Sequence, residues 1–224
     1  YAFPGGAWAK IQTVLLSTRA VSASSADVYV AFKVRLHPSG TAIYAGDTGV
    51  SSGDFHKVLL PANGTAQVGY DSQYYGGDSG GGALWFNKAG DKLFGSGGGV
   101  YTVNPSAGSN ATDLIYAGTL TDFGDYSYGW VASLSHSAVN SELAVIPRVL
   151  TQTEARNDRQ LRLYSDTTWV LTRTIPLTKF VIAGKAHTAH GRFVFHRSDS
   201  SKRYVVVEAD TTTGLANDYG VAVY

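Results

Sequence analysis

The 224-residue chain has no cysteine, no methionine and only three glutamates. The lack of cysteine excludes disulfides, zinc–thiolate sites and thiol nucleophiles, and it favours a protein made in a reducing compartment. Because translation starts at methionine, we expect a processed chain or, as we favour, a fragment excised from a longer one. No apolar run approaches the ~18 residues of a membrane-spanning helix, so no membrane insertion is expected.

The chain also has no large excess of positive or negative charge, since its formal net charge is +1. Residues 1–147 hold 7 Lys/Arg and 10 Asp/Glu, a balance of −3, whereas residues 148–224 hold 11 and 7, a balance of +4. This polarity is too mild for a nucleic-acid-binding tract. The segment Ala183–Ala186 contains Gly-Lys but lacks the spacing of a phosphate-binding loop, and no cofactor is expected.

What the chain has in abundance is strand and turn signals. Residues 27–36 alternate strictly, with Val30, Phe32 and Val34 on one face, which is typical of a half-buried antiparallel strand. Only Thr151–Arg159 resembles a helix, with Thr151 and Glu154 spaced as a capping box. The sequence therefore predicts one all-β domain over residues 1–224, an antiparallel sandwich or Greek-key barrel with long Gly-rich loops and at most one short helix.

Further strands are expected along the whole chain. Turn residues such as Asn87–Gly90, a plausible hairpin, separate them. Gly80–Trp85 and Gly97–Thr102 resemble each other, but this similarity is too weak to predict a repeat fold. The expected strands cover residues 11–17, 55–60, 83–86, 100–103, 114–120, 128–134, 143–150, 161–164, 169–174, 179–183, 191–196, 203–208 and 219–224.

One motif suggests catalysis. Gly77–Gly81 (Gly-Asp-Ser-Gly-Gly) matches the nucleophile motif of chymotrypsin-like serine proteases, in which the serine needs a histidine base and an oxyanion hole. Too few residues precede Ser79 for the preceding barrel of that family, and neither His37 nor His56 has the family's sequence context. A glycine-rich surface turn is the favoured interpretation, and the chain is not expected to be an enzyme.

The histidines near the C-terminus form a second candidate site. His187 and His190 would point to opposite faces of a strand, which argues against a metal site. His190, Arg192 and His196 would share a face, with Arg197 at the next turn. This pattern predicts an exposed polar face or a site for an anionic glycan. Paired carboxylates for glycoside hydrolysis are not evident, because Asp210, which would share a strand face with Glu208, leads straight into a turn.

Aromatic clusters form the third candidate site. Tyrosine and tryptophan combine a large rigid contact area with a polar tip, which suits recognition of sugars or protein loops, although some of these rings must pack in the core. The clusters comprise Tyr74, Tyr75 and Trp85 around the first glycine loop, and Tyr126, Tyr128 and Trp130 further along the chain.

As a whole, this cysteine-free chain rich in Tyr, Ser, Thr and Gly resembles a viral capsid projection of the astrovirus spike or hepevirus protruding-domain type. It opens with Tyr1–Trp8 and closes on Asp218–Tyr224. The resemblance implies a non-catalytic homodimeric spike on the virion surface that binds a host receptor or glycan and neutralising antibodies. The alternatives are an extracellular carbohydrate-binding lectin or an adhesin or phage receptor-binding domain, and, more remotely, a serine hydrolase using Ser79.

Overall fold

The computed structural model describes residues 1–3, 9–28, 33–47, 54–62, 64–73, 82–121, 130–148, 159–210, 213–215 and 217–224, with backbone alone at 9, 25–28 and 130. These residues form strands and turns and contain no helix. Residues 151–158 of the predicted helix lie outside the described part. The chain divides into two compact units, Tyr1–Gly118 and Thr119–Tyr224.

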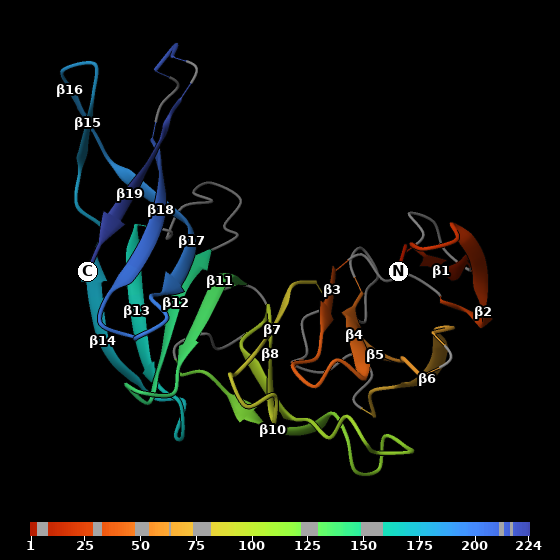
Figure 1. Ribbon diagram of the computed structural model, residues 1–224. Helices are drawn as coiled ribbons and strands as arrows, with labels where there is room; N and C mark the ends of the chain where they lie inside the picture. The colour runs from red at the N-terminus through yellow and green to blue at the C-terminus, as the bar shows by residue number, and fades with distance from the viewer. Residues whose placement is uncertain are drawn as a thin grey trace. The chain divides into compact units, whose positions relative to one another are not determined.

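The first unit contains a hairpin and two four-stranded antiparallel sheets, and Figure 1 labels most of their strands. In each sheet the strands pair in chain order. The hairpin consists of β1 (Ala9–Leu15) and β2 (Ala20–Val28). The first sheet contains β3 (Lys33–Leu36), β4 (Ala42–Gly46), β5 (Phe55–Leu59) and β6 (Gln67–Asp71). The second contains β7 (Leu84–Phe86), β8 (Lys92–Gly95), β9 (Gly99–Thr102) and β10 (Ile115–Thr119).

The second unit repeats this construction. One sheet has four strands, a second has three among the described residues, and a short hairpin connects them along the chain. The four-stranded sheet contains β11 (Trp130–Ser137), β12 (Glu142–Arg148), β13 (Gln160–Ser165) and β14 (Leu171–Pro176). The hairpin contains β15 (Phe180–Ile182) and β16 (Lys185–His187). The last sheet contains β17 (Ala189–His196), β18 (Arg203–Ala209) and β19 (Tyr219–Val223).

Within each unit the sheets stack through their apolar faces. Strand β4 is buried along its whole length. Because successive side chains of a strand point to opposite faces, both faces of β4 must be covered. Its Tyr44 packs towards Leu93 of the β7–β10 sheet, whereas its Ile43 packs with Ile11 of the first hairpin. A strand that is covered on both faces needs apolar residues at every position, and β4 (Ala-Ile-Tyr-Ala-Gly) meets this requirement.

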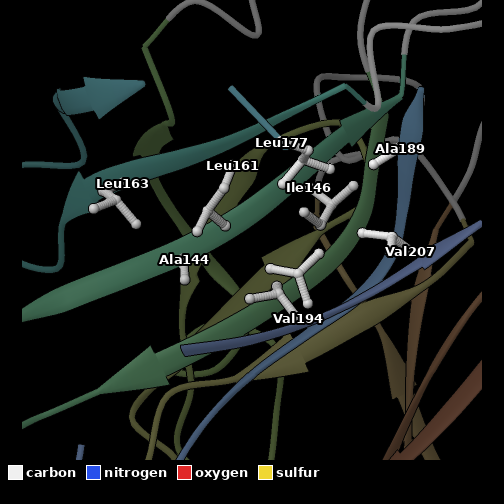
Figure 2. Close-up of a cluster of buried hydrophobic side chains, with 9 residues drawn as sticks. Ala144, Ile146, Leu161, Leu163, Leu177, Ala189, Val194 and Val207 are labelled. Carbon is white, nitrogen blue, oxygen red and sulfur yellow. The ribbon is translucent and has the colours of Figure 1, made fainter. Parts of the chain in front are cut away.

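The second unit has its core between the β11–β14 and β17–β19 sheets. Figure 2 shows the side chains that fill this space, with Ala144 and Ile146 from β12 and Val194 and Val207 from β17 and β18. Gly191 lies against this core, where an added Cβ would come within 2.8 Å of the Ile146 side chain. Close packing of the two sheets therefore requires glycine at this position of β17.

Turns of six residues join the first two strands of all four sheets, and three of them share one geometry, whereas the turn at 137–142 has its left-handed residue one position later, at Ser141. These turns span residues 37–42, 87–92, 137–142 and 197–202, so they recur at intervals of 50, 50 and 60 residues. In three of them the first N–H donates to the carbonyl of the sixth residue, at 2.9–3.1 Å. Their fourth residue is left-handed: Gly40, Gly90 and Ser200 have φ of +75°, +83° and +59°. The chain is therefore a structural repeat, which the glycine similarity in the sequence did not predict.

The prediction of a sandwich or Greek-key barrel is wrong. Strands pair with their chain neighbours in several short sheets, and small sheets of this kind are the blades of a β-propeller. The clearest predicted strand, residues 27–36, belongs to two sheets, since β2 ends at Val28 and β3 begins at Lys33. Alternation reports which face is buried and not which strands share a sheet. The predicted hairpin at Asn87–Gly90 is confirmed by the pairing of β7 with β8, whereas β2, β4, β6, β8 and β16 were not predicted.

Candidate functional site

Several predicted site residues lie outside the described part of the chain. They are Tyr74, Tyr75, Tyr126 and Tyr128, together with the side chain of Trp130 and the loop that carries Ser79. Trp85 lies in β7, opposite Phe94 of β8, and is half-buried. A binding role for these aromatic residues stays a prediction.

The predicted polar face at His190, Arg192 and His196 is divided by a β-bulge. The register of β17 against β18 shifts between Gly191 and Phe193, and an extra residue reverses which side chains point to which face. His190 is buried, and Arg192 forms an ion pair with Glu208. His196 lies beyond the bulge and faces β11. Arg197 is exposed and pairs with Asp199 in its own turn, with 3.4 Å between Nε and Oδ2.

His196 belongs to a polar cluster between the two sheets of the second unit. Its Nδ1 lies 3.0 Å from Ser135 Oγ, and its Nε2 lies 3.2 Å from Glu142 Oε1. Arg203 donates to both oxygens of Glu142, at 2.5 and 2.8 Å. Burial raises the pKa of Glu142, but the hydrogen bonds from His196 and Arg203 outweigh it and leave the pKa below its usual value. Glu142 therefore stays ionised and accepts hydrogen bonds from Arg203 and from Nε2–H of His196.

Ser135, His196 and Glu142 contact one another in the order of a catalytic serine–histidine–acid triad. The other hydrogen bonds of this serine, however, join two strands. Ser135 Oγ also accepts the backbone N–H of His196 at 3.0 Å, and Ser133 Oγ accepts that of Val194 at 3.1 Å. The two serines lie at alternate positions of β11 and bind successive inward positions of β17 in the same way. This ladder of side-chain hydrogen bonds joins the first strands of neighbouring sheets.

A second histidine cluster lies in the first unit, where β4, β5 and β6 meet. His56 contacts Asp47 through Nε2 at 2.7 Å and Asp71 through Nδ1 at 2.5 Å. Burial alone would lower the pKa of His56, but the two carboxylates raise it to about 10. The imidazole is therefore a cation at neutral pH, and it holds the three strands together and does not act as a base.

Lys57 and Asp113 form a buried ion pair, with both side chains fully inaccessible and 3.0 Å apart. Asp113 Oδ2 accepts the hydroxyls of Tyr44 and Tyr70, each at 2.8 Å. Its Oδ1 accepts two backbone N–H groups, those of Asn104 and Leu114, at 2.8 and 2.9 Å. Burial and then Asp113 raise the pKa of both tyrosines. This satisfied network fixes the loop before β10 to the β3–β6 sheet.

The recurring turns of neighbouring sheets are also joined. His37 Nε2 lies 2.8 Å from the carbonyl oxygen of Gly90, and Asn140 Nδ2 donates to that of Ser200 at 2.9 Å. In each unit the acceptor is the left-handed fourth residue of the second turn. In each unit the first turn is therefore bonded to the turn of the second sheet.

Two further features are absent from the described residues. No group of three or more His, Asp or Glu side chains there could hold a metal ion. No helix in that part of the chain has the length and apolar character needed to cross a bilayer.

Several exposed apolar side chains lie together on the side of the β17–β19 sheet that faces away from the core. Phe193 and Val221 are each 61% exposed. They lie in one row across the sheet with Val206, because both pair with it in register. In the next row Phe195 stacks on Tyr204, with ring centroids 5.3 Å apart. We call this surface the outer face; it comprises Phe193, Phe195, Tyr204, Val206, Tyr219, Val221 and Val223.

Sequence reasoning missed the outer face, although a signal was present. Within the predicted strands, the stretches Phe193–Phe195, Tyr204–Val207 and Tyr219–Tyr224 contain no charged residue and are apolar throughout, as in strands that are covered on both faces. In β14, by contrast, Thr172, Arg173 and Thr174 are all exposed. The missed signal was therefore the absence of polar residues on the second face of these strands.

Comparisons with known proteins bear on the fold. No protein-family model matches the chain, and no curated protein matches its sequence. Among solved structures, the β-propeller domain of Cps50 (Swd1) from Myceliophteria thermophila is 11% identical, with a TM-score of 0.54 over 87% of this chain and 53% of that one. The periplasmic gluconolactonase PpgL of Pseudomonas aeruginosa is 12% identical, with a TM-score of 0.51 over 86% and 55%. The Dos1 propeller is 9% identical, with a TM-score of 0.52 over 89% and 45%.

These similarities show the fold and overturn the viral interpretation. This chain spans about half the length of the solved structures it matches. They are β-propellers of cellular proteins, so the resemblance to an astrovirus or hepevirus spike is wrong, and with it the predicted capsid function. The alternatives of a lectin, adhesin or phage receptor-binding domain find no support in them either. The described sheets are blades of β-propeller type.

Proposed function

We propose that this chain is a non-catalytic scaffold of β-propeller type and that it binds another protein surface through the outer face of the β17–β19 sheet. The observation that carries the proposal is the exposure of Phe193, Phe195, Val221 and Val223 on a sheet whose opposite side is a packed core. A large exposed apolar patch on a folded domain is typical of an interaction site.

The chemistry of the outer face supports protein binding. Its charged neighbours Arg192 and Glu208 pair with each other, and Tyr219 adds a hydroxyl 3.3 Å from Glu208. The face therefore presents aromatic and β-branched side chains without an uncompensated charge. Covering a large apolar side chain is worth about 1.5–3 kcal/mol before the entropic cost of association.

The polar clusters support a non-catalytic role. His56 is held as a cation between two carboxylates, and Lys57 is enclosed with Asp113. His196 lies between Ser135 and Glu142, and Arg203 already neutralises Glu142. Each of these groups is engaged in joining strands, so none is poised to exchange a proton with a substrate.

Substitutions on the two sides of β17 test this proposal. Phe193→Ser should change the free energy of unfolding of a dilute sample by less than about 0.5 kcal/mol, because the side chain is a surface group. The matched control Val194→Ala, on the buried side, should cost about 1–3 kcal/mol. If Phe193→Ser costs as much as the control, the outer face is already covered within the single chain, and the proposal is wrong.

A second candidate function is hydrolysis of an ester or lactone at Ser135. It is favoured by the contacts of Ser135 with His196 and of His196 with Glu142, and one similar structure is described as a gluconolactonase. Fluorophosphonate labelling that is lost in Ser135→Ala and kept in Ser133→Ala would support this candidate. Ser133 is the matched control because it makes the same hydrogen bond to β17. Absence of labelling, together with no gluconolactone hydrolysis above the spontaneous rate, would exclude it.

A further inference from the structure

In two rows of the outer face the side chain on the first strand is larger than the side chain on the last. The first strand, β17, carries the aromatic side chains Phe193 and Phe195, and the last strand, β19, carries the smaller Val221 and Val223 in the same rows, with Tyr219 beyond them. The middle strand contributes Tyr204 and Val206. In register, Phe193 is in the row of Val221, and Phe195 is in the row of Val223.

A two-fold axis that runs parallel to the strands and lies above β18 brings the large side chains of one copy opposite the small side chains of the other. Such an axis leaves each row at the same height and exchanges the two sides of the sheet. It places β17 of one copy over β19 of the other, so that Phe193 meets Val221 and Phe195 meets Val223. Large side chains then oppose small ones, which is the arrangement that lets two packed sheets interdigitate. An isologous dimer requires this kind of complementarity.

Charge permits the same pairing. Arg192 and Glu208, beside the outer face, form an ion pair within each copy, and Arg197 pairs with Asp199. These charges therefore do not oppose the approach of two copies. A partner with a polar or strongly charged surface would leave the apolar rows poorly matched.

Sheets within the chain already pack face to face through apolar side chains, as the proposed contact requires. The opposite side of the same sheet is covered by the β11–β14 sheet, through aliphatic side chains from Ile146, Leu161, Val194 and Val207. In the first unit the β3–β6 sheet is covered on both sides in this way. The outer face has the composition of these covered faces, so a further antiparallel sheet is the surface that fits it.

We propose that the outer face packs against the outer face of a second copy of this chain and forms a two-fold dimer with β17 over β19. The inference rests on the proposed function, since it names the partner of the same surface. It goes beyond that function by specifying which strand of one copy lies over which strand of the other.

Sedimentation velocity and light scattering over a wide range of concentration test the dimer. The wild-type chain should reach twice its monomer mass of 23.8 kDa. Phe193→Lys and Val221→Glu should each remain at the monomer mass, because each would bury an unpaired charge. The double variant Phe193→Lys/Val221→Glu should recover the dimer, since the introduced charges lie opposite each other across the axis. Val139→Lys, in an exposed turn of the other sheet, should dimerise like the wild type.

A cross-linking measurement covers the case in which a charged variant does not fold. The chain has no cysteine, so Phe193→Cys and Val221→Cys can be prepared separately and mixed. A short bis-maleimide should join one variant to the other and should join neither efficiently to itself. Wild-type protein that stays monomeric at all concentrations, a dimer that persists in Phe193→Lys, or cross-links without this preference would overturn the proposal.

The outcomes separate this inference from the function on which it rests. A monomer in which Phe193→Ser is neutral for stability refutes the second copy and leaves the outer face open to a sheet from another polypeptide. A monomer in which Phe193→Ser is strongly destabilising refutes the binding surface itself.

Discussion

The hydrogen bond between neighbouring turns can be tested with glycines at equivalent positions. Gly40 and Gly90 are both the fourth residue of the recurring turn, with φ of +75° and +83°. A Cβ at Gly40 would meet nothing within 4 Å, whereas at Gly90 it would lie 2.6 Å from His37 Nε2. Alanine substitution at the two sites therefore differs mainly in its effect on His37.

The expected costs follow from these contacts. A left-handed alanine costs about 1–2 kcal/mol, and this applies at both sites. At Gly90 the His37 ring must also move, which adds about 1–3 kcal/mol for overpacking and about 0.5–1.5 kcal/mol for the lost 2.8 Å hydrogen bond. Gly90→Ala should therefore destabilise the first unit by roughly 2–4 kcal/mol more than Gly40→Ala.

Urea unfolding followed by tryptophan fluorescence would measure both variants, with Trp85 reporting on the first unit. In a His37→Ala background the excess cost at Gly90 should disappear, because the ring that the new Cβ meets is gone. This double-mutant cycle separates the contact from the backbone strain. Equal costs for Gly40→Ala and Gly90→Ala, within about 0.5 kcal/mol, would refute the reasoning.

Two further predictions concern the buried charges. Asp113→Asn should cost about 3–5 kcal/mol in urea unfolding because it leaves Lys57 buried without a counter-charge. Lys57→Met should cost less, since the carboxylate keeps four donors, and the reverse order would contradict this account. The pKa of His56 is raised to about 10 from an unfolded value near 6.5. Its stabilisation is therefore complete below about pH 6.5 and is lost as the pH rises towards 10. His56→Gln should flatten that part of the stability profile, and an unchanged slope would argue against a charged His56.

In the candidate sites, the sequence did not predict which side chains meet. The even spacing of His190, Arg192 and His196 was visible in the sequence, but the bulge after Gly191 was not, so His196 was expected on the same face as Arg192. The ion pairs of His56 with Asp47 and Asp71 join residues 9 and 15 positions apart. No local pattern marks such partners, because strand register brings them together.

The fold, too, could be predicted only as far as local sequence patterns reach. Alternating and apolar runs were enough to predict an all-β chain and most of its strands, because burial of one or both faces leaves a period of two or a continuous apolar run. How those strands are grouped into sheets depended on tertiary contacts. Short turns pair each strand with its neighbour, and each sheet then needs another sheet to cover its apolar face.

By itself, therefore, the sequence determined that this protein is built of strands, that it forms no disulfide and that its turns depend on glycine and asparagine. Only the tertiary structure decided that the strands form successive blades and that Ser135, Glu142 and His196 meet. It also decided that one apolar sheet face stays exposed. The physical reason is that side-chain alternation is a local property, whereas the partner of each face is set by packing between segments distant along the chain.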